Sequence, residues 1–193
     1  RLEKQQAQAE LDRAEQNAVG LYNQIVDVSE SGEGTTVRYD IGQGISSENL
    51  QVSLNTSQNY IDIRVDNAEP PYPMDTWTIV EGNNLQNLSV GEGTYGRQSD
   101  NLPGSVVVKP VGLPDNSIIT FRVDFRNLYV QSPTGGQLNR INLSAEGTTE
   151  GADSTTLFIA NRGTSWERGN DGVTLPSGER LPRKNTEILV GFR

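Results

Sequence analysis

The first 28 residues repeat apolar side chains at the spacing of a helix. The background is rich in Gln, Glu, Ala and Arg and contains no Pro, which favours one helix over residues 1–28. Its narrow apolar seam is formed by Ala7, Leu11, Ala14, Ala18, Leu21, Ile25 and Val28. The seam is richer in its second half, so we expect that half to bury more surface. Gly20 interrupts the pattern and predicts either close packing or a bend.

After a Gly/Ser break at residues 29–34, the apolar period changes from 3.6 to 2. Short alternating segments separated by Pro, Gly and Asn turns predict strands at 35–41, 50–54, 60–65, 76–80, 105–109, 118–130, 138–145, 155–160 and 186–192. The segments 118–130 and 138–145 are expected to pair as a hairpin. We therefore predict a mainly β fold in which residues 35–193 form an antiparallel β-sandwich headpiece, immunoglobulin-like or jelly-roll-like, behind one N-terminal α-helix.

Composition removes several classes of chemistry. The chain has no His and no Cys, so it cannot build a Ser-His-Asp or Cys-His site, a thiolate metal site or a disulfide. Its 25 acidic residues exceed its 16 basic ones, which opposes binding to nucleic acid. We expect no cofactor and no enzymatic activity.

Carboxylates are the remaining candidates for chemistry. Asp62, Asp124 and Glu187 alternate with apolar residues in predicted strands, where a solvated outer face is the ordinary interpretation. A carboxylate-only hydrolase would need two of them buried together in a cleft. The oxygen-rich segments 150–153 and 169–172 could donate ligands to Ca²⁺, but their sequences are more typical of ordinary turns. No metal ligand is therefore assigned.

Two further features concern the surface. Trp166 stands among polar residues in a predicted loop and is a candidate ligand contact, whereas Trp77 alternates like a core strand residue. Asn-X-Ser/Thr sequons at Asn55, Asn87 and Asn142 are candidate glycosylation sites. Asn142 lies in a strand pattern and could carry a glycan only on an exposed face.

The helix has two interpretations. Its seam packs on the sandwich of its own chain, or its polar first half projects and continues a longer helix that assembles with other copies or anchors in a membrane. In the second interpretation, the predicted helix interface consists of Ala7, Leu11, Ala14, Ala18, Leu21 and Ile25. The pattern starts directly at Arg1, and we expect about 20 apolar residues upstream of it, the length that crosses a bilayer.

This layout resembles the soluble part of archaeal type IV pilin-like proteins, including archaellins. The resemblance rests on the polar stretch Gln5 to Glu15, the stretch Ala18 to Tyr22 that leads to Val28, the Gly/Ser break and the all-β remainder. It implies an apolar assembly helix and a β-rich headpiece at the cell surface. Accessory β-sandwich proteins of the archaellum stator share the same plan.

These observations lead to two hypotheses. The first is a non-enzymatic, extracellular surface protein, either a pilin-like filament subunit or a membrane-anchored accessory or stator component. Its partners would be other copies or other surface subunits, reached through the helix. The second is a carbohydrate- or protein-binding module of adhesin type, with Trp166 or the Pro-rich segment 70–74 in contact with the ligand.

Overall fold

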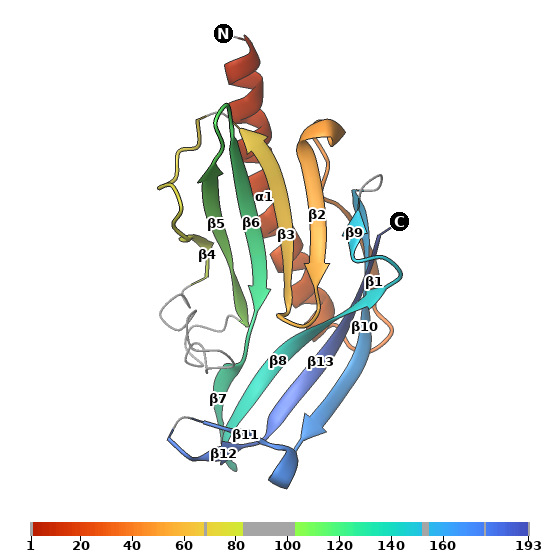
Figure 1. The fold of residues 1–193 in the computed structure, drawn as a ribbon. Coiled ribbons are helices and arrows are strands. Elements are labelled where there is room, and N and C mark those ends of the chain that lie inside the picture. The colour runs from red at the N-terminus through yellow and green to blue at the C-terminus, as the bar shows by residue number, and fades with distance from the viewer. Residues whose placement is uncertain (1, 68, 83–102, 152–154, 176, 193) are drawn as a thin grey trace.

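The computed structural model describes residues 2–67, 69–82, 103–151, 155–175 and 177–192 (Figure 1). Within these residues one α-helix, α1, spans Leu2–Glu30, and the elements after it are strands and two short 3-10 turns. The strands are β1 (Thr36–Asp40), β2 (Leu50–Asn55), β3 (Tyr60–Asn67), β4 (Thr78–Glu81), β5 (Gly104–Gly112), β6 (Ser117–Phe125), β7 (Leu128–Ser132), β8 (Gly135–Glu146), β9 (Glu150–Gly151), β10 (Thr156–Glu167), β11 (Val173–Thr174), β12 (Arg180–Leu181) and β13 (Arg183–Phe192). Short 3-10 turns, η1 (Ser47–Asn49) and η4 (Gly169–Asp171), precede β2 and follow β10.

The fold is mainly β, an antiparallel sandwich with one N-terminal helix, as the sequence predicts. The order is β4-β5-β6-β3-β2-β9 in a six-stranded sheet and β1-β10-β13-β8-β7 in a five-stranded sheet, and β11 and β12 form a small ribbon. One pair departs from the prediction, because β13 runs parallel to β8. Alternation along a strand assigns its two faces but not the direction of its neighbour, so the sequence could not reveal this pair.

The predicted hairpin between 118–130 and 138–145 is only partly right. Segment 118–130 divides at Arg126 and Asn127: β6 pairs with β3 and β5 in one sheet, and β7 pairs with β8 in the other. Asn59 joins the two sheets beside this crossing. Its Nδ2 donates to the carbonyls of Phe125 at 2.9 Å and Ile141 at 2.6 Å, and its Oδ1 accepts from the amide of Leu143 at 2.7 Å.

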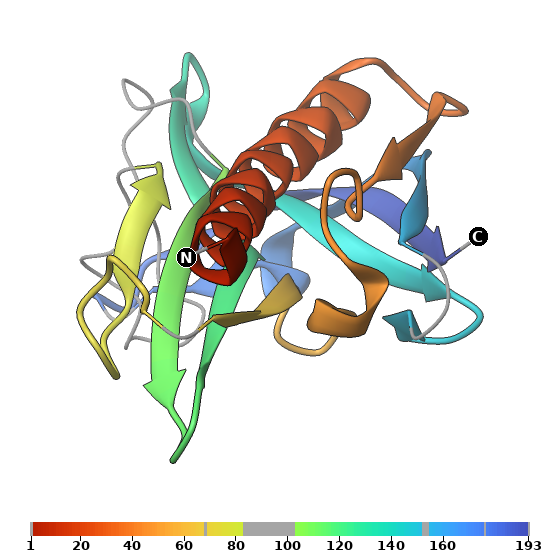
Figure 2. The same ribbon diagram turned by 90° about the horizontal axis from the view of Figure 1, so that it is seen from above.

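The helix belongs to the same hydrophobic core as the sheets. It contacts β3, β4, β5 and β6 of one sheet and β1, β10 and β13 of the other. Figure 2 shows the helix from its N-terminal side, running obliquely across the molecule. Tyr22 stacks on Phe125 with ring centroids 5.6 Å apart. Gly20 serves close packing, because a Cβ at this position would overlap the hydroxyl of Tyr39.

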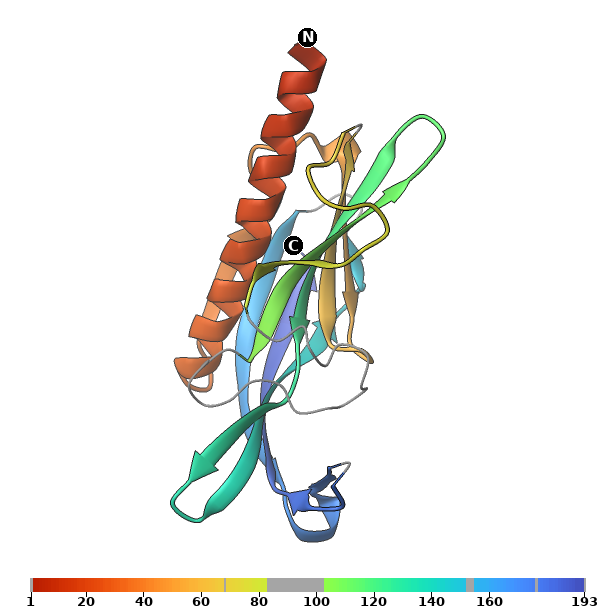
Figure 3. The ribbon, with the colours of Figure 1, turned by 90° about the vertical axis from the view of Figure 1, so that its left-hand side faces the viewer.

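The two ends of α1 differ. At the C-terminal end, Asn161 Nδ2 donates to the carbonyls of Val28 at 3.0 Å and Ser29 at 3.4 Å, which satisfies acceptors that a helix leaves open. At the other end, the first turns extend past the edges of both sheets (Figures 1 and 3). The C-terminal end of the helix is therefore bound to the β-sandwich, whereas its N-terminal end projects beyond it.

Candidate functional site

The seam of α1 faces inward from Leu11 onward. Leu11, Ala14, Ala18, Leu21 and Ile25 are all at most 1% exposed, and they pack on the sheets of their own chain. Only Ala7, among the predicted interface residues, is half-buried rather than buried. The expectation that the five buried residues contact a partner is corrected, because their surface is already covered within the chain.

The first turns of α1 are exposed on most sides, whereas its later turns keep only their outer face in solvent. The side chains of residues 3–6, 8 and 9 are exposed. Lys4 reaches Glu69 on the β3–β4 crossover at 2.9 Å, and both side chains remain more than 70% exposed. Such a solvent-exposed pair contributes little stability. Within the described chain, no helix combines the length and the apolar character that a bilayer crossing requires.

The same crossover meets α1 at a second place. Tyr72 donates a short hydrogen bond to Glu15 and contacts Phe121 edge-on, with ring centroids 6.2 Å apart. Burial and the nearby carboxylate both raise the pKa of the Tyr72 hydroxyl. One turn closer to the N-terminus, the Glu10 carboxylate accepts from Ser46 N and Asn49 Nδ2. Polar side chains therefore hold α1 against the β-sandwich as far toward the N-terminus as Glu10.

A charged cluster occupies the outward face of the six-stranded sheet. Asp62, only 1% exposed, accepts two hydrogen bonds from Arg122 at 2.8 and 3.0 Å. The Arg122 guanidinium carbon lies 3.6 Å from the ring centroid of Tyr60 and 4.7 Å from that of Trp77. Two predictions are wrong here. Asp62 is not solvated, and Trp77 is half-buried over this outward cluster rather than in the core.

Asp124 is also buried, contrary to the prediction, and it accepts from Arg126 Nε at 2.7 Å. Burial raises the pKa of its carboxyl, whereas Arg126 and Arg122 oppose that shift and Asp62 adds to it. Two buried carboxylates therefore lie near each other, as a carboxylate-only hydrolase would need. Asp62 and Asp124 are each paired with an arginine, and neither carboxylate lines the two grooves described next.

The third carboxylate considered in the sequence, Glu187, is exposed, as predicted.

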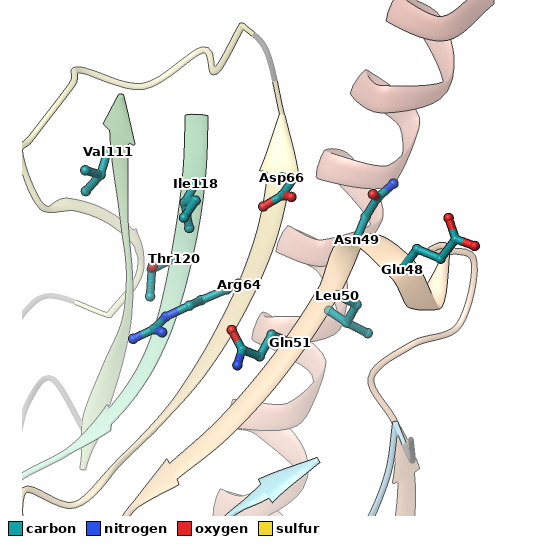
Figure 4. A pocket seen from close by; sticks show the side chains of 9 residues that line it. All are labelled: Glu48, Asn49, Leu50, Gln51, Arg64, Asp66, Val111, Ile118 and Thr120. Carbon is teal, nitrogen blue, oxygen red and sulfur yellow. The ribbon is translucent and has the colours of Figure 1, made fainter. Parts of the chain in front are cut away.

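A shallow groove of about 550 Å³ lies on the outward face of the six-stranded sheet, at the end from which α1 projects (Figure 4). Its lining combines polar and apolar side chains from four strands and η1, namely Glu48, Asn49, Leu50, Gln51, Arg64, Asp66, Val111, Ile118 and Thr120. Its charges are two carboxylates and one guanidinium. This arrangement can hydrogen-bond a polar ligand but contains no aromatic platform.

Trp166 lies in β10, not in a loop, and it is 40% exposed, as its polar neighbours suggested. The Arg168 guanidinium carbon lies 4.5 Å from its ring centroid. Lys184 on β13 is directly opposite Trp166 in the strand register. Lys184 also lines a second groove, of about 320 Å³, between the C-terminal end of α1 and the five-stranded sheet.

The opposite face of the same strands carries a separate ion pair. Glu167 accepts from Arg183 Nε at 2.5 Å and from Asn185 Nδ2 at 3.1 Å. These hydrogen bonds, that of Arg183 first, lower the pKa of the Glu167 carboxyl. Because successive residues of a strand face opposite sides, Glu167 does not neutralise the cations beside Trp166.

The remaining candidate positions are less distinctive. Segment 169–172 is a turn in which Arg180 donates to Asn170. In segment 150–153, the first two residues form β9 and the last two lie outside the described residues. Within the described ranges, no cluster of three acidic residues could hold a metal ion. Asn55 is half-buried, and its Nδ2, the atom that would carry a glycan, donates to Tyr60 Oη at 3.2 Å.

The other two sequons differ in what the structure describes. Asn142 is half-buried opposite the exposed Glu187, on the outward face of β8, whereas Asn87 lies outside the described residues. Use of the three sequons stays a prediction.

Comparison with known proteins adds no assignment. No protein-family model, curated protein or solved structure gave a significant match to the chain.

Proposed function

We propose that this protein is a non-enzymatic component of a cell surface, a β-sandwich headpiece carried on α1. In this proposal it serves either as a pilin-like filament subunit or as a membrane-anchored accessory component, exposed to the medium. The proposal is supported mainly by the difference in burial between the two halves of α1. The apolar seam of this one continuous helix is buried from Leu11 to Val28, whereas residues 3–9 are exposed apart from the half-buried Ala7.

The projecting turns of α1 have little packing of their own. Short helices are marginal in water, and most helical stability in proteins comes from packing of one face. The turns at residues 3–9 have little such packing, yet they continue a helix whose other half is fixed in a core. A partner helix, or an apolar continuation that enters a bilayer, would supply the missing stabilisation. The half of α1 that packs in the core would then set the orientation of the headpiece.

The charge of the chain supports an outer-surface role. A formal charge of −9 on 193 residues keeps a surface hydrated and opposes non-specific association. The sandwich closes over one shared core, so it can present this acidic surface as a folded unit.

Site-specific photo-crosslinking in cells that express the native gene tests the proposal. A photoreactive residue replaces Gln5 on the projecting turns or, as a matched control on the same helix, the exposed Asn23. We expect crosslinks from position 5 but not from position 23. Crosslinks to a second copy would indicate a filament subunit, and crosslinks to lipid or another membrane protein would indicate an accessory component. Absence of crosslinks at position 5, with the protein recovered from the cytosol, would refute both roles.

A further inference from the structure

We propose that the Trp166 end of the five-stranded sheet binds an acidic carbohydrate, a chain that contains uronic acid residues. This inference is independent of the role proposed for the first turns of α1, because it uses the opposite end of the β-sandwich (Figure 1). It would give a surface component a specific ligand.

The strand register places four side chains in one row. Trp166 of β10 is opposite Lys184 of β13, Lys184 is opposite Asn139 of β8, and Asn139 is opposite Leu128 of β7. Residues paired in this way lie on the same face of a sheet and contact their neighbours. The last three of them also line the 320 Å³ groove. The indole of Trp166, on β10, is therefore next to the groove, because the neighbouring strand β13 lines it through Lys184.

The chemistry of this row suits an acidic sugar. An indole presents a flat apolar surface that can cover the apolar face of a pyranose ring, and 40% of Trp166 is open to solvent. Arg168 lies over the ring, and Lys184 stands beside it without a carboxylate partner among the described residues. A ligand carboxylate could take the place of the missing partner.

The groove supplies hydrogen bonds and direction. Asn139, Thr186 and Ser29 contribute polar side chains, and the volume of about 320 Å³ is at the small end of ligand pockets, which span about 300–1,000 Å³. Glu30, at the end of α1, also lines the groove and would repel a carboxylate near it. The acidic group of the ligand is thus directed toward Lys184 and Arg168.

The distribution of charge separates this end from the rest of the chain. Residues 162–184 contain five basic and three acidic residues, although the whole chain has a formal charge of −9. An anionic polymer is repelled by most of such a protein, so local cations determine where it can approach. Charge complementarity therefore favours an acidic over a neutral carbohydrate as the occupant.

Titration calorimetry on the folded chain tests the proposal with three acidic probes: alginate oligosaccharides, polygalacturonate oligosaccharides and chondroitin sulfate. Maltohexaose is the neutral comparison. We expect at least one acidic probe to bind and maltohexaose not to bind, with weaker binding in 500 mM than in 50 mM NaCl. Trp166→Ala should weaken binding at least tenfold and Lys184→Gln at least threefold.

Matched controls come from the other sheet. Ile79→Ala removes an equally exposed apolar side chain, and Lys109→Gln removes a lysine near Trp77; both should leave the affinity within twofold. Failure of all three acidic probes to bind would overturn the proposal. So would equal binding of maltohexaose, or equal losses in the control variants. Thermal unfolding of each variant checks that a loss of binding is not a loss of folding.

Discussion

Asp62 and Arg122 face each other across β3 and β6 and form a two-bond ion pair on the outward face of the sheet. The carboxylate is 1% exposed and the Arg122 side chain 26% exposed. Arg64 also approaches Asp62, but at 3.8 Å and with a side chain 45% exposed. Two arginines thus contact one buried carboxylate in very different ways.

Replacement of Arg122 should be far more costly than replacement of Arg64. Arg122→Met leaves Asp62 buried without its two donated hydrogen bonds, so we expect the free energy of unfolding to fall by about 3–5 kcal/mol. Arg64→Met should lower it by less than about 1 kcal/mol, since the pair is long and solvated. Urea unfolding of both variants measures the contrast, and equal losses would show that Asp62 does not depend on Arg122.

Asn59 should be among the most sensitive positions in the β-sandwich. It is 1% exposed, has a φ of +65°, and links the two sheets by three hydrogen bonds. Asn59→Gly keeps the backbone conformation but leaves buried groups unpaired, so we expect a loss of about 3 kcal/mol or more in unfolding free energy. Asn59→Ala should lose about 1 kcal/mol more, because Ala disfavours positive φ.

The exposed neighbour Gln58 is the control for this site. Gln58→Ala should change the unfolding free energy by less than about 0.5 kcal/mol. A small effect of Asn59→Gly would contradict the role of the side chain as the link between the sheets.

Gly20 and Tyr39 should show energetic coupling. Ala at position 20 would gain about 1 kcal/mol in an unconstrained helix, but its Cβ would overlap the Tyr39 hydroxyl, which donates to the carbonyl of Asn17 at 3.0 Å. We expect Gly20→Ala to destabilise the fold by about 1–3 kcal/mol. The cost should be smaller in a Tyr39→Phe background. A double-mutant cycle measures the coupling, and strictly additive effects would exclude it.

Stability should fall at alkaline pH partly through Tyr22. Burial is the main cause that raises the pKa of Tyr22 to about 12. The unfolded state ionises near pH 10 and the folded state only near pH 12, so stability is lost as the pH rises through this window. From pH 9 to pH 11, the unfolding free energy of the native chain should fall by about 1 kcal/mol relative to Tyr22→Phe. A pH-independent difference between the two proteins would refute this assignment.

Much of the architecture can be predicted from the sequence because it depends on local periodicity. The seam from Leu11 to Val28 and the inward alternation of Ile61, Ile63 and Val65 are direct consequences of helix and strand periods, and all of them are buried. Features that depend on pairing were not predictable. The break at Arg126 and Asn127 and the parallel pair of β8 and β13 arise from which strands meet, and single-strand patterns do not contain that information.

The charged and aromatic residues show the same limit. Asp62 and Asp124 alternate with apolar residues and were expected in solvent, but both are buried. Asp62 pairs with Arg122, which only the register of β3 and β6 brings beside it, whereas Asp124 pairs with Arg126, two residues along the chain. Trp166 was singled out by its polar neighbours, whereas Lys184 was not. The pairing of β10 with β13 places them together, and no spacing along the chain indicates it.

The proposed function requires that α1 packs on its own β-sandwich from Leu11 to Val28 and on a partner before Leu11. Amide hydrogen exchange tests this division most directly. Exchange is compared between the isolated chain and the native membrane or filament preparation, for residues 6–9 and for residues 18–25 as the internal reference. The account predicts that amides 18–25 are protected in both preparations. It also predicts that amides 6–9 exchange freely in the isolated chain and become protected at least tenfold in the native preparation. Equal exchange of residues 6–9 in the two preparations would contradict it.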